Sequence, residues 1–189
     1  FDYGVVSKRA NGQAVREYRL SAVDRTIEIM PGLFYAAWTY NGQVPGPTLR
    51  CTEGDLVRVH FHNAGTHDHT VHFHGFHASN MDGVFEQVPP GGSYLYEFEA
   101  EPFGLQLYHC HTMPLKRHIA KGLYGAMIID PKRGRPPAHE VVMVMNGFDV
   151  NFDGENEVYA VNTVPFAYQA QPIVLRRGEL NRIYLVNVL

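Results

Sequence analysis

The sequence is poor in cysteine and has no long apolar run, and both absences narrow the class of protein. Two cysteines, Cys51 and Cys110, cannot make the disulfide framework of a small stapled fold. No stretch is apolar over the roughly 20 residues that a membrane-spanning helix requires, so we expect no membrane span. The opening residues, Phe1-Asp2-Tyr3, are polar and mixed, unlike a signal peptide. This opening is expected of a cytoplasmic protein or of a mature secreted one.

The chain also lacks a cluster of basic residues. Its 16 lysines and arginines are outnumbered by 19 acidic residues, which gives a formal net charge of −3, so nucleic-acid binding is not expected. Hydrophobic residues make up 45% of the 189 positions, enough for a packed core in one or two domains. Histidine is abundant instead: all but one of the 11 histidines fall between His60 and His118. The candidate chemistry is therefore concentrated in one region.

Short alternating segments separated by glycine and proline predict an all-β fold. This pattern is typical of a Greek-key β-sandwich rather than of a helical protein. A helical turn is expected only near residues 115–121. The segments predicted as strands are residues 17–22, 25–30, 34–40, 56–63, 93–99, 104–108, 125–130 and 140–145.

A second pattern divides the chain into two unequal parts. Residues 132–138 are rich in proline and arginine and are interpreted as a linker. They separate a first domain, residues 1–131, from residues 139–189. Residues 54–63 and 178–187 form a weak repeat at a constant offset of 124. A second copy of the histidine motif would begin only near residue 196, so we expect residues 139–189 to be the start of a second, truncated domain of the same kind.

The densest chemistry is the run His109-Cys110-His111, which is followed eight residues after the cysteine by His118. Thiolate sulfur and imidazole nitrogen together suit copper, zinc or iron. Along an extended strand, neighbouring side chains point to opposite faces, so Cys110 is expected on one face and the two flanking histidines on the other. One metal ion could not use all three without breaking the strand. The run therefore predicts two metal sites, one on each side.

A second histidine cluster, between His69 and His74, has the same two-sided pattern. His72 and His74 are two residues apart and share one face of a strand, where they form a natural chelating pair. His69 has an odd spacing to both and faces the other way. Each cluster thus offers imidazoles to one side and a single ligand, His69 or Cys110, to the other.

Two other interpretations of Cys110 are compatible with the residues alone. A free cysteine is often an inert core residue, and the histidines around it would then be incidental. A structural zinc site is the other interpretation, although such sites are usually closed tetrahedra with paired cysteines, and the only other cysteine is Cys51. The remaining pair of clustered histidines, His60 and His62, shares a strand face with Arg58 and is interpreted as solvated.

Together the two clusters resemble the copper motifs of the multicopper oxidases. The similarity is greatest to two-domain, laccase-like members that assemble as trimers and carry a blue copper in the first cupredoxin domain. It is strong from Asn41 to Pro131 and weak elsewhere, through the repeat. The residues that carry it are His69-x-x-His72-x-His74-Gly75, and His109-Cys110-His111 with His118.

The resemblance implies how copper ligands are distributed. In this family, half of the trinuclear cluster comes from the second domain of a neighbouring subunit, so a homotrimer is also implied. The implied ligands are His69, Cys110 and His118 for type 1 copper, His72 for type 2 copper, and His74, His109 and His111 for the type 3 pair.

The same resemblance gives meaning to two further positions. Leu123 stands five residues after His118, where related sequences have an axial methionine, and a non-coordinating leucine is expected to raise the reduction potential. Met113 and Met127 are the other candidates for an axial ligand, and Met127 is the one expected in the core. Asp82 resembles an acid that relays protons during oxygen reduction, although it also fits a plain turn residue.

The implied activity is oxidation of a phenol-like compound or a metal ion, coupled to reduction of O2 to water. A copper nitrite reductase is an alternative with the same fold, but in that family an aspartate stands at the position of His72 and a small residue at that of His111. A single-copper electron carrier is a third possibility, with no use for histidines on the opposite face. A periplasmic or secreted location follows from the resemblance alone. Three histidines receive no assignment: His67, His77 and His139.

Overall fold

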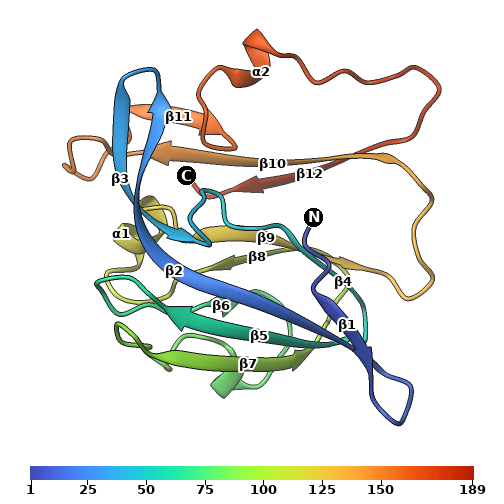
Figure 1. Cartoon of the computed structure of the whole chain (residues 1–189). Coiled ribbons are helices and arrows are strands. Elements are labelled where there is room, and N and C mark those ends of the chain that lie inside the picture. The colour runs from blue at the N-terminus through green and yellow to red at the C-terminus, as the bar shows by residue number, and fades with distance from the viewer.

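The structure, a computed structural model, describes all 189 residues and consists mainly of β-strands (Figure 1). Two sheets pack face to face as a sandwich, which confirms the all-β prediction. One sheet contains β1 (Val5–Lys8), β2 (Ala14–Met30), β3 (Leu33–Tyr40), β5 (Leu56–Asn63) and β7 (Ser93–Glu99). The other contains β4 (Leu49–Thr52), β6 (His72–Phe73), β8 (Gly104–His109) and β9 (Tyr124–Asp130).

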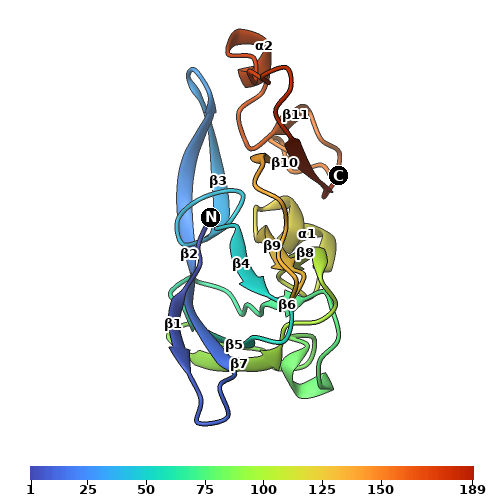
Figure 2. The same cartoon turned by 90° about the vertical axis from the view of Figure 1, so that its right-hand side faces the viewer.

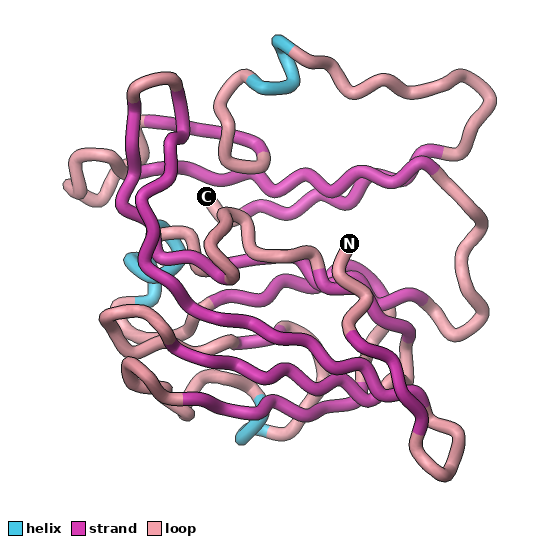
Figure 3. The backbone as a smooth tube through the Cα atoms, in the orientation of Figure 1, coloured by secondary structure: helices cyan, strands magenta, loops and turns pink.

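A third sheet lies next to the sandwich, above it in both Figure 1 and Figure 2. It contains β10 (His139–Phe148), β11 (Val158–Val161) and β12 (Asn181–Asn187). Between β11 and β12 the chain forms a long loop with one short helix, α2 (Ala167–Ala170), as Figure 3 shows. The other helical segments are α1 (Leu115–Ala120), at the predicted turn, and the 3-10 turn η1 (Ser79–Met81). No helix reaches the length and apolarity needed to cross a membrane.

The alternating sequence of β5 explains which of its side chains face the core. Leu56, Val57, Val59 and Phe61 are buried, while His62 is exposed, so period-2 alternation directs apolar side chains inward. The strand pairs in parallel with β2 and antiparallel with β7. The alternating segments predicted at 17–22 and 25–30 lie on the single strand β2, whose first half pairs with β5 and whose second half pairs with β3.

The sandwich core is unusually aromatic, and its tyrosines also fix the surrounding loops. A cluster of 21 buried residues fills the space between the two sheets. Burying each large apolar side chain contributes about 1.5–3 kcal/mol. The hydroxyl of Tyr18 donates to the carbonyl of Arg50 at 2.6 Å, and that of Tyr108 donates to the carbonyl of Pro47 at 2.6 Å. Each buried hydroxyl is thereby satisfied, and the segment around β4 is tied to the core.

A second core of nine buried residues joins the third sheet to the sandwich. It brings Tyr35 and Tyr124 of the sandwich together with Phe148 and Val186 of the third sheet. Tyr35 and Phe148 meet edge to face, with ring centroids 5.0 Å apart. The boundaries at 131 and 139 therefore separate two sheet systems that share apolar contacts, and their division into domains remains a prediction.

The weak repeat has opposite burial in its two copies. Val59 and Phe61 are buried on β5, but the residues 124 positions later, Ile183 and Leu185 on β12, are 52% and 56% exposed. β12 pairs in parallel with β10, as β5 pairs in parallel with β2. The third sheet thus has one apolar face that no second sheet of this chain covers.

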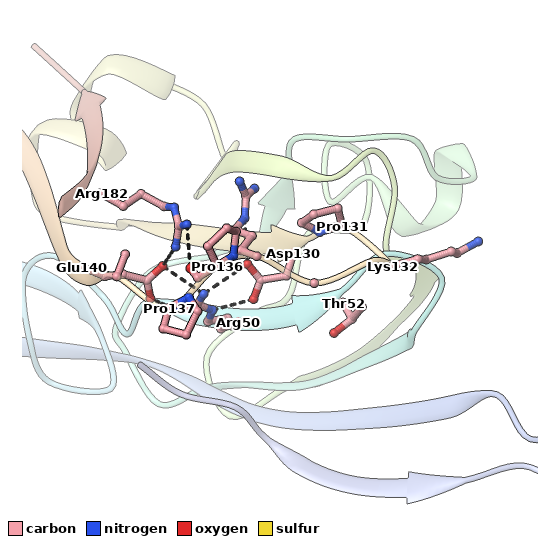
Figure 4. Close-up of a pocket in the computed structure, with 12 residues that line it drawn as sticks. Arg50, Thr52, Asp130, Pro131, Lys132, Pro136, Pro137, Glu140 and Arg182 are labelled. Atoms are coloured by element: carbon pink, nitrogen blue, oxygen red, sulfur yellow. Dashed lines mark hydrogen bonds and ion pairs between the residues drawn. The ribbon is translucent and has the colours of Figure 1, made fainter. Parts of the chain in front are cut away.

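A charged network also connects the sandwich to the third sheet (Figure 4). The buried guanidinium of Arg50, on β4, donates to Asp130 at 2.7 Å and pairs with Glu140 on β10. Glu140 also pairs with Arg182 and accepts a hydrogen bond from the Tyr184 hydroxyl at 3.0 Å, both on β12. The hydrogen bonds from Arg50 and Arg182 lower the pKa of the Glu140 carboxyl to about 2.

This network predicts an acid-dependent contribution to stability. The pKa of Glu140 is near 4.5 when unfolded and about 2 when folded, so its contribution is complete above pH 4.5 and is lost as the pH falls toward 2. At neutral pH, Glu140→Gln should lower the free energy of unfolding by about 1.5–3 kcal/mol, because charge-assisted hydrogen bonds are lost. Urea unfolding at several pH values, with exposed Glu179→Gln as the control, checks this. A difference that is constant between pH 6 and pH 3 would contradict it.

Candidate metal centres

Three side chains from separate segments converge on one buried point. His69 follows β5 in a loop, Cys110 directly follows β8, and His118 lies on α1. His69 and Cys110 are fully buried, and His118 is 4% exposed. The Cys110 sulfur lies 3.3 Å from Nδ1 of His118 and 3.8 Å from Nδ1 of His69, and the two nitrogens are 3.3 Å apart. These three residues form the first ligand group.

The shape of this triangle fits a metal ion in the plane of its three donor atoms. A point equidistant from the three atoms lies about 2.0 Å from each, which is close to the length of a bond from imidazole nitrogen to a first-row metal. Burial lowers the pKa of His69 and of His118 to about 4, so both imidazoles are neutral at ordinary pH. Neutral imidazole is the form that binds metals.

The first ligand group has an apolar and largely fixed surrounding. The only tryptophan, Trp38, packs against both imidazoles, with ring centroids 5.3 Å from His69 and 4.8 Å from His118. Leu123 is fully buried, and its backbone is hydrogen-bonded to two of the three ligand residues. Its carbonyl accepts from the N–H of Cys110 at 3.0 Å, and its N–H donates to the carbonyl of His118 at 3.3 Å. Leu123 is therefore positioned next to the group.

The two methionines considered as axial ligands lie elsewhere. Met113 is 74% exposed, unlike the buried group. Met127 is buried on β9, opposite Gln106, four residues beyond Leu123. At about 3.3 Å per residue, this places it roughly 13 Å along the strand from Leu123.

A second ligand group lies on the other side of the Cys110 backbone. His72 and His109 are directly opposite each other on β6 and β8, and His74 follows β6. One ring nitrogen from each of the three lies within 4.8 Å of the others, and Nε2 of His74 is 3.1 Å from Nε2 of His109. Burial lowers the pKa of His74, and that of His109 to about 4. These neutral imidazoles are suited to binding metal.

Hydrogen bonds orient two of these rings. Nδ1 of His72 donates to the carbonyl of Asp82 at 2.6 Å, and Nδ1 of His109 donates to the carbonyl of Cys110 at 2.9 Å. In each ring the bond fixes the tautomer, so Nε2 carries the free lone pair.

His111 lies beside the second group, outside its closest set of nitrogens. Its ring centroid is 5.2 Å from that of His72 and 5.9 Å from that of His109, with which it is stacked. The structure thus brings six of the seven sequence-predicted ligands into two compact groups and places the seventh at the edge of the second group.

Asp82 and His77 form a pair next to the second group. Asp82 ends η1, with its side chain 32% exposed. Its Oδ1 lies 2.8 Å from Nε2 of His77 and 3.4 Å from Nδ1 of His72. The His77 side chain is only 2% exposed. Apart from its nearness to the His72 cluster, no local pattern predicted this burial. Asp82 thus ends a turn and also lies next to two histidine side chains.

Two of the other histidines belong to neither group. His67 is exposed and packs at a tilt against Trp38 at a centroid distance of 4.4 Å, with its ring centroid 6.5 Å from that of His69. His139 begins β10, where its Nδ1 is 3.3 Å from the Asn181 side chain.

Comparison with known proteins identifies the family. The family model described as multicopper oxidase matches residues 23–134. A solved multicopper oxidase is 51% identical, with a TM-score of 0.98, and the match covers all of this chain and 68% of the other. A copper-containing nitrite reductase from Neisseria meningitidis is 34% identical over 131 residues, or 68% of this chain and 34% of that protein. Copper resistance protein A of Escherichia coli is 36% identical, over 61% of this chain and 20% of its own length.

These relatives agree on copper chemistry and differ in activity. This chain spans only about a third of the nitrite reductase and a fifth of the copper resistance protein. The printed names of the relatives describe copper oxidoreductases and a copper resistance protein, which identifies copper as the metal of the family. The family model covers more than half of the chain, so this chain belongs to the multicopper oxidase family.

Proposed function

We propose that this chain forms the type 1 copper site and half of the trinuclear site of a multicopper oxidase. The whole protein would couple one-electron oxidation of a phenol-like compound or metal ion to four-electron reduction of O2 to water. Two ligand groups are joined by a single peptide bond, because Cys110 belongs to the first group and its neighbour His109 to the second. This observation supports the proposal most directly. Copper would supply the electron transfer and oxygen reduction at these groups.

The proposed ligand roles follow the two groups. The first group would hold type 1 copper, in a trigonal set without a strong axial donor. The second group would hold the trinuclear coppers, together with histidines from the second domain of a neighbouring subunit in a homotrimer. The proposed roles are type 1 for His69, Cys110 and His118, type 2 for His72, and type 3 for His74, His109 and His111.

Thr70 connects the two groups through hydrogen bonds on three sides. Its N–H donates to the Cys110 sulfur at 3.4 Å, and its Oγ1 accepts from the N–H of His111 at 2.9 Å. Its carbonyl accepts from the buried hydroxyl of Tyr40 at 2.5 Å. Hydrogen bonds to a ligating sulfur tune the reduction potential of a copper–thiolate site. Thr70 would therefore both tune the first group and fix the backbone that leads to the second.

Asp82 and His77 are positioned to move protons to the second group. Asp82 is partly exposed and lies within hydrogen-bonding distance of His77. Its carboxylate would take protons from solvent and hold them next to His72, on the oxygen-reducing side. Reduction of one O2 to two waters consumes four protons, so a fixed acid at this position serves the reaction.

Two further parts of the proposal concern the whole protein. The exposed apolar face of the third sheet, which includes Ile183 and Leu185, supports a second cupredoxin domain in which a complementary sheet covers this face. A periplasmic or secreted location is the second part. Fractionation of cells that express the native protein would test it.

Nitrite reduction is the alternative that the 34% identical relative supports. It would need one mononuclear catalytic copper instead of three clustered ones. In this chain His72 lies directly opposite His109, and both belong to a compact group with His74. Three imidazoles can hold a single metal ion, and it is the fourth imidazole beside them, His111, that favours a cluster over one mononuclear copper.

Copper content and the optical spectrum of the native protein test the function. We expect about four coppers per chain, an intense absorption near roughly 600 nm from the copper–thiolate bond, and a near-ultraviolet shoulder from the type 3 pair. Cys110→Ser should abolish the intense band, whereas Cys51→Ala, at the only other cysteine, should preserve it. About two coppers without the shoulder, together with nitrite consumption, would replace the oxidase with a nitrite reductase.

The axial position gives a second prediction. Leu123→Met would place a thioether next to the first group and should lower the reduction potential of type 1 copper, because the axial ligand tunes it. Redox titration of the visible band measures the change. The control is Met127→Leu, the reverse exchange roughly 13 Å along the strand from Leu123, which should leave the potential unchanged. An equal reduction potential in Leu123→Met and the wild type would show that residue 123 does not occupy the axial position.

Thr70 gives a third prediction. Thr70→Val removes Oγ1 and leaves the N–H of His111 without its partner, which should lower the free energy of unfolding by about 1–3 kcal/mol. Thr70→Ser retains the oxygen and should recover most of this loss. Because the N–H of Thr70 is retained in both variants, the visible band should persist in both. Chemical denaturation gives the stability, and equal stability of the two variants would show that the hydroxyl is dispensable.

A further inference from the structure

A cavity of about 710 Å³ opens between α1 and the loop that joins β10 to β11. These two segments lie close together at the left of Figure 1. The volume falls within the range of about 300–1,000 Å³ that is typical of small-molecule sites. Neither ligand group lines this cavity, and the charge and aromatic character of its walls are specific enough to define what it binds.

One wall of the cavity is cationic. Lys116, Arg117 and Lys121 all project from the α1 region into its lining. The Lys116 ammonium donates to the carbonyl of Gly154 at 2.7 Å, and that of Lys121 donates to the carbonyl of Ala36 at 2.9 Å. Each ammonium has three donors, so two remain on each. The Arg117 guanidinium lies over the Trp38 ring and makes no side-chain hydrogen bond or ion pair within the chain, so its N–H donors keep no protein acceptor.

The acidic residues of the lining are already satisfied by their own loop. The Asp149 carboxylate accepts from the N–H groups of Asp153 and Gly154 at 3.1 and 2.8 Å. The Asp153 carboxylate accepts from Glu155 N–H at 2.9 Å and from the Asn151 amide at 3.1 Å. Both oxygens of each carboxylate are thus engaged by the loop, whereas Lys116 and Lys121 each keep donors that meet no acceptor of the chain. Burial and the nearby Arg117 charge lower the pKa of Lys121, as expected where positive charges crowd together.

The opposite wall presents an aromatic ring. Phe152 is 58% exposed and is held at a φ of 63°, a left-handed conformation that is uncommon for a bulky residue. The Lys121 ammonium lies 3.9 Å from the centroid of this ring, and the ring of Tyr35 lies 6.0 Å away. Backbone strain of this kind is concentrated at binding sites. The Lys121 ammonium covers one face of the Phe152 ring, and the exposed remainder of the ring, beside the unused donors of Lys116 and Lys121, suits a flat ligand that carries a negative group.

The cavity is also connected to the first ligand group by direct packing. The Arg117 guanidinium lies over the Trp38 ring at 5.4 Å, and the Trp38 ring lies 4.8 Å from the His118 ring. Arg117 is moreover the residue that precedes His118 on α1. A molecule in this cavity would therefore be separated from the first group by one layer of side chains.

We propose that this cavity binds small aromatic anions, with the negative group on Lys116, Arg117 and Lys121 and the ring against Phe152. This ligand is the reducing substrate, an assignment that rests on the proposed function. Each bound phenolate would give up one electron and leave as a phenoxyl radical; the copper that His69, Cys110 and His118 would hold supplies one-electron chemistry, and O2 is the final oxidant. Four such electrons, with four protons from solvent, convert one O2 to two waters.

Binding of a redox-inert ligand tests the site apart from turnover. The probes are 4-methoxybenzoate and its neutral counterpart 4-methoxybenzamide, titrated calorimetrically into the copper-loaded native protein. The anion should bind at least tenfold more tightly than the amide. Equal affinity for the two, or no binding of the anion, would overturn the proposal.

The four lysines of the chain provide matched variants. The double variant Lys116→Gln/Lys121→Gln should weaken 4-methoxybenzoate binding at least tenfold. The control Lys8→Gln/Lys132→Gln has the same change in net charge outside the cavity and should bind within twofold of the wild type. The visible copper band and thermal unfolding establish that each variant is folded. A cavity variant that binds like the control would contradict the assigned ligand contacts.

The outcome for the cavity is distinguishable from the outcome for the proposed function. If the native protein holds about four coppers and reduces O2 but does not bind the anion, only the cavity assignment is wrong. If the anion binds through the two lysines but the copper content excludes a trinuclear cluster, the cavity remains an aromatic-anion site and the oxidase proposal is wrong. As an additional readout, the KM for 4-hydroxycinnamate should rise in Lys116→Gln/Lys121→Gln, while the KM for O2 should not change.

Discussion

The backbone step from His109 to Cys110 is the constraint on which the rest of the site depends. These adjacent residues direct their side chains into two different ligand groups, so the separation of the groups is fixed by covalent geometry. The hydrogen bond from Cys110 N–H to the carbonyl of Leu123 holds this step against the start of β9. His69 and His72, only three residues apart, are divided in the same way, with His69 in the first ligand group and His72 in the second. Thr70, between them, donates its N–H to the Cys110 sulfur and accepts a hydrogen bond from the N–H of His111, the residue after the step.

Burial does as much as ligand choice to prepare these groups. The aromatic core surrounds the first group, and this burial disfavours a protonated imidazole, so His69 and His118 are neutral before any metal binds. In the second group, backbone carbonyls hold the other nitrogen of His72 and His109. The protein therefore presents lone pairs in fixed directions instead of rearranging to form a site.

Local spacing was sufficient to predict much of the fold and the site. The alternation of residues 56–63 predicted β5 with its actual bounds, and the odd and even spacings around His72 and Cys110 anticipated the two groups. Features that depend on distant contacts were not predictable. The burial of His77 depends on packing against Phe98, 21 residues later, and the shared core depends on Tyr35 meeting Phe148. The cavity is formed by Lys121 and Phe152, which no local pattern connects.

The parallel pairings of the sandwich determine when a metal can enter. β2 pairs with β5 through Val15 and Leu56, and β4 pairs with β9 through Leu49 and Met127, so strands far apart in sequence must meet before either sheet is complete. Such non-local pairing slows folding, because chain closure costs entropy before contacts repay it. His69 and Cys110 are 41 residues apart, and they converge only after these pairings form. Until that moment the Cys110 thiol is open to oxidation, so the redox state of the compartment during folding decides how much protein can take up metal.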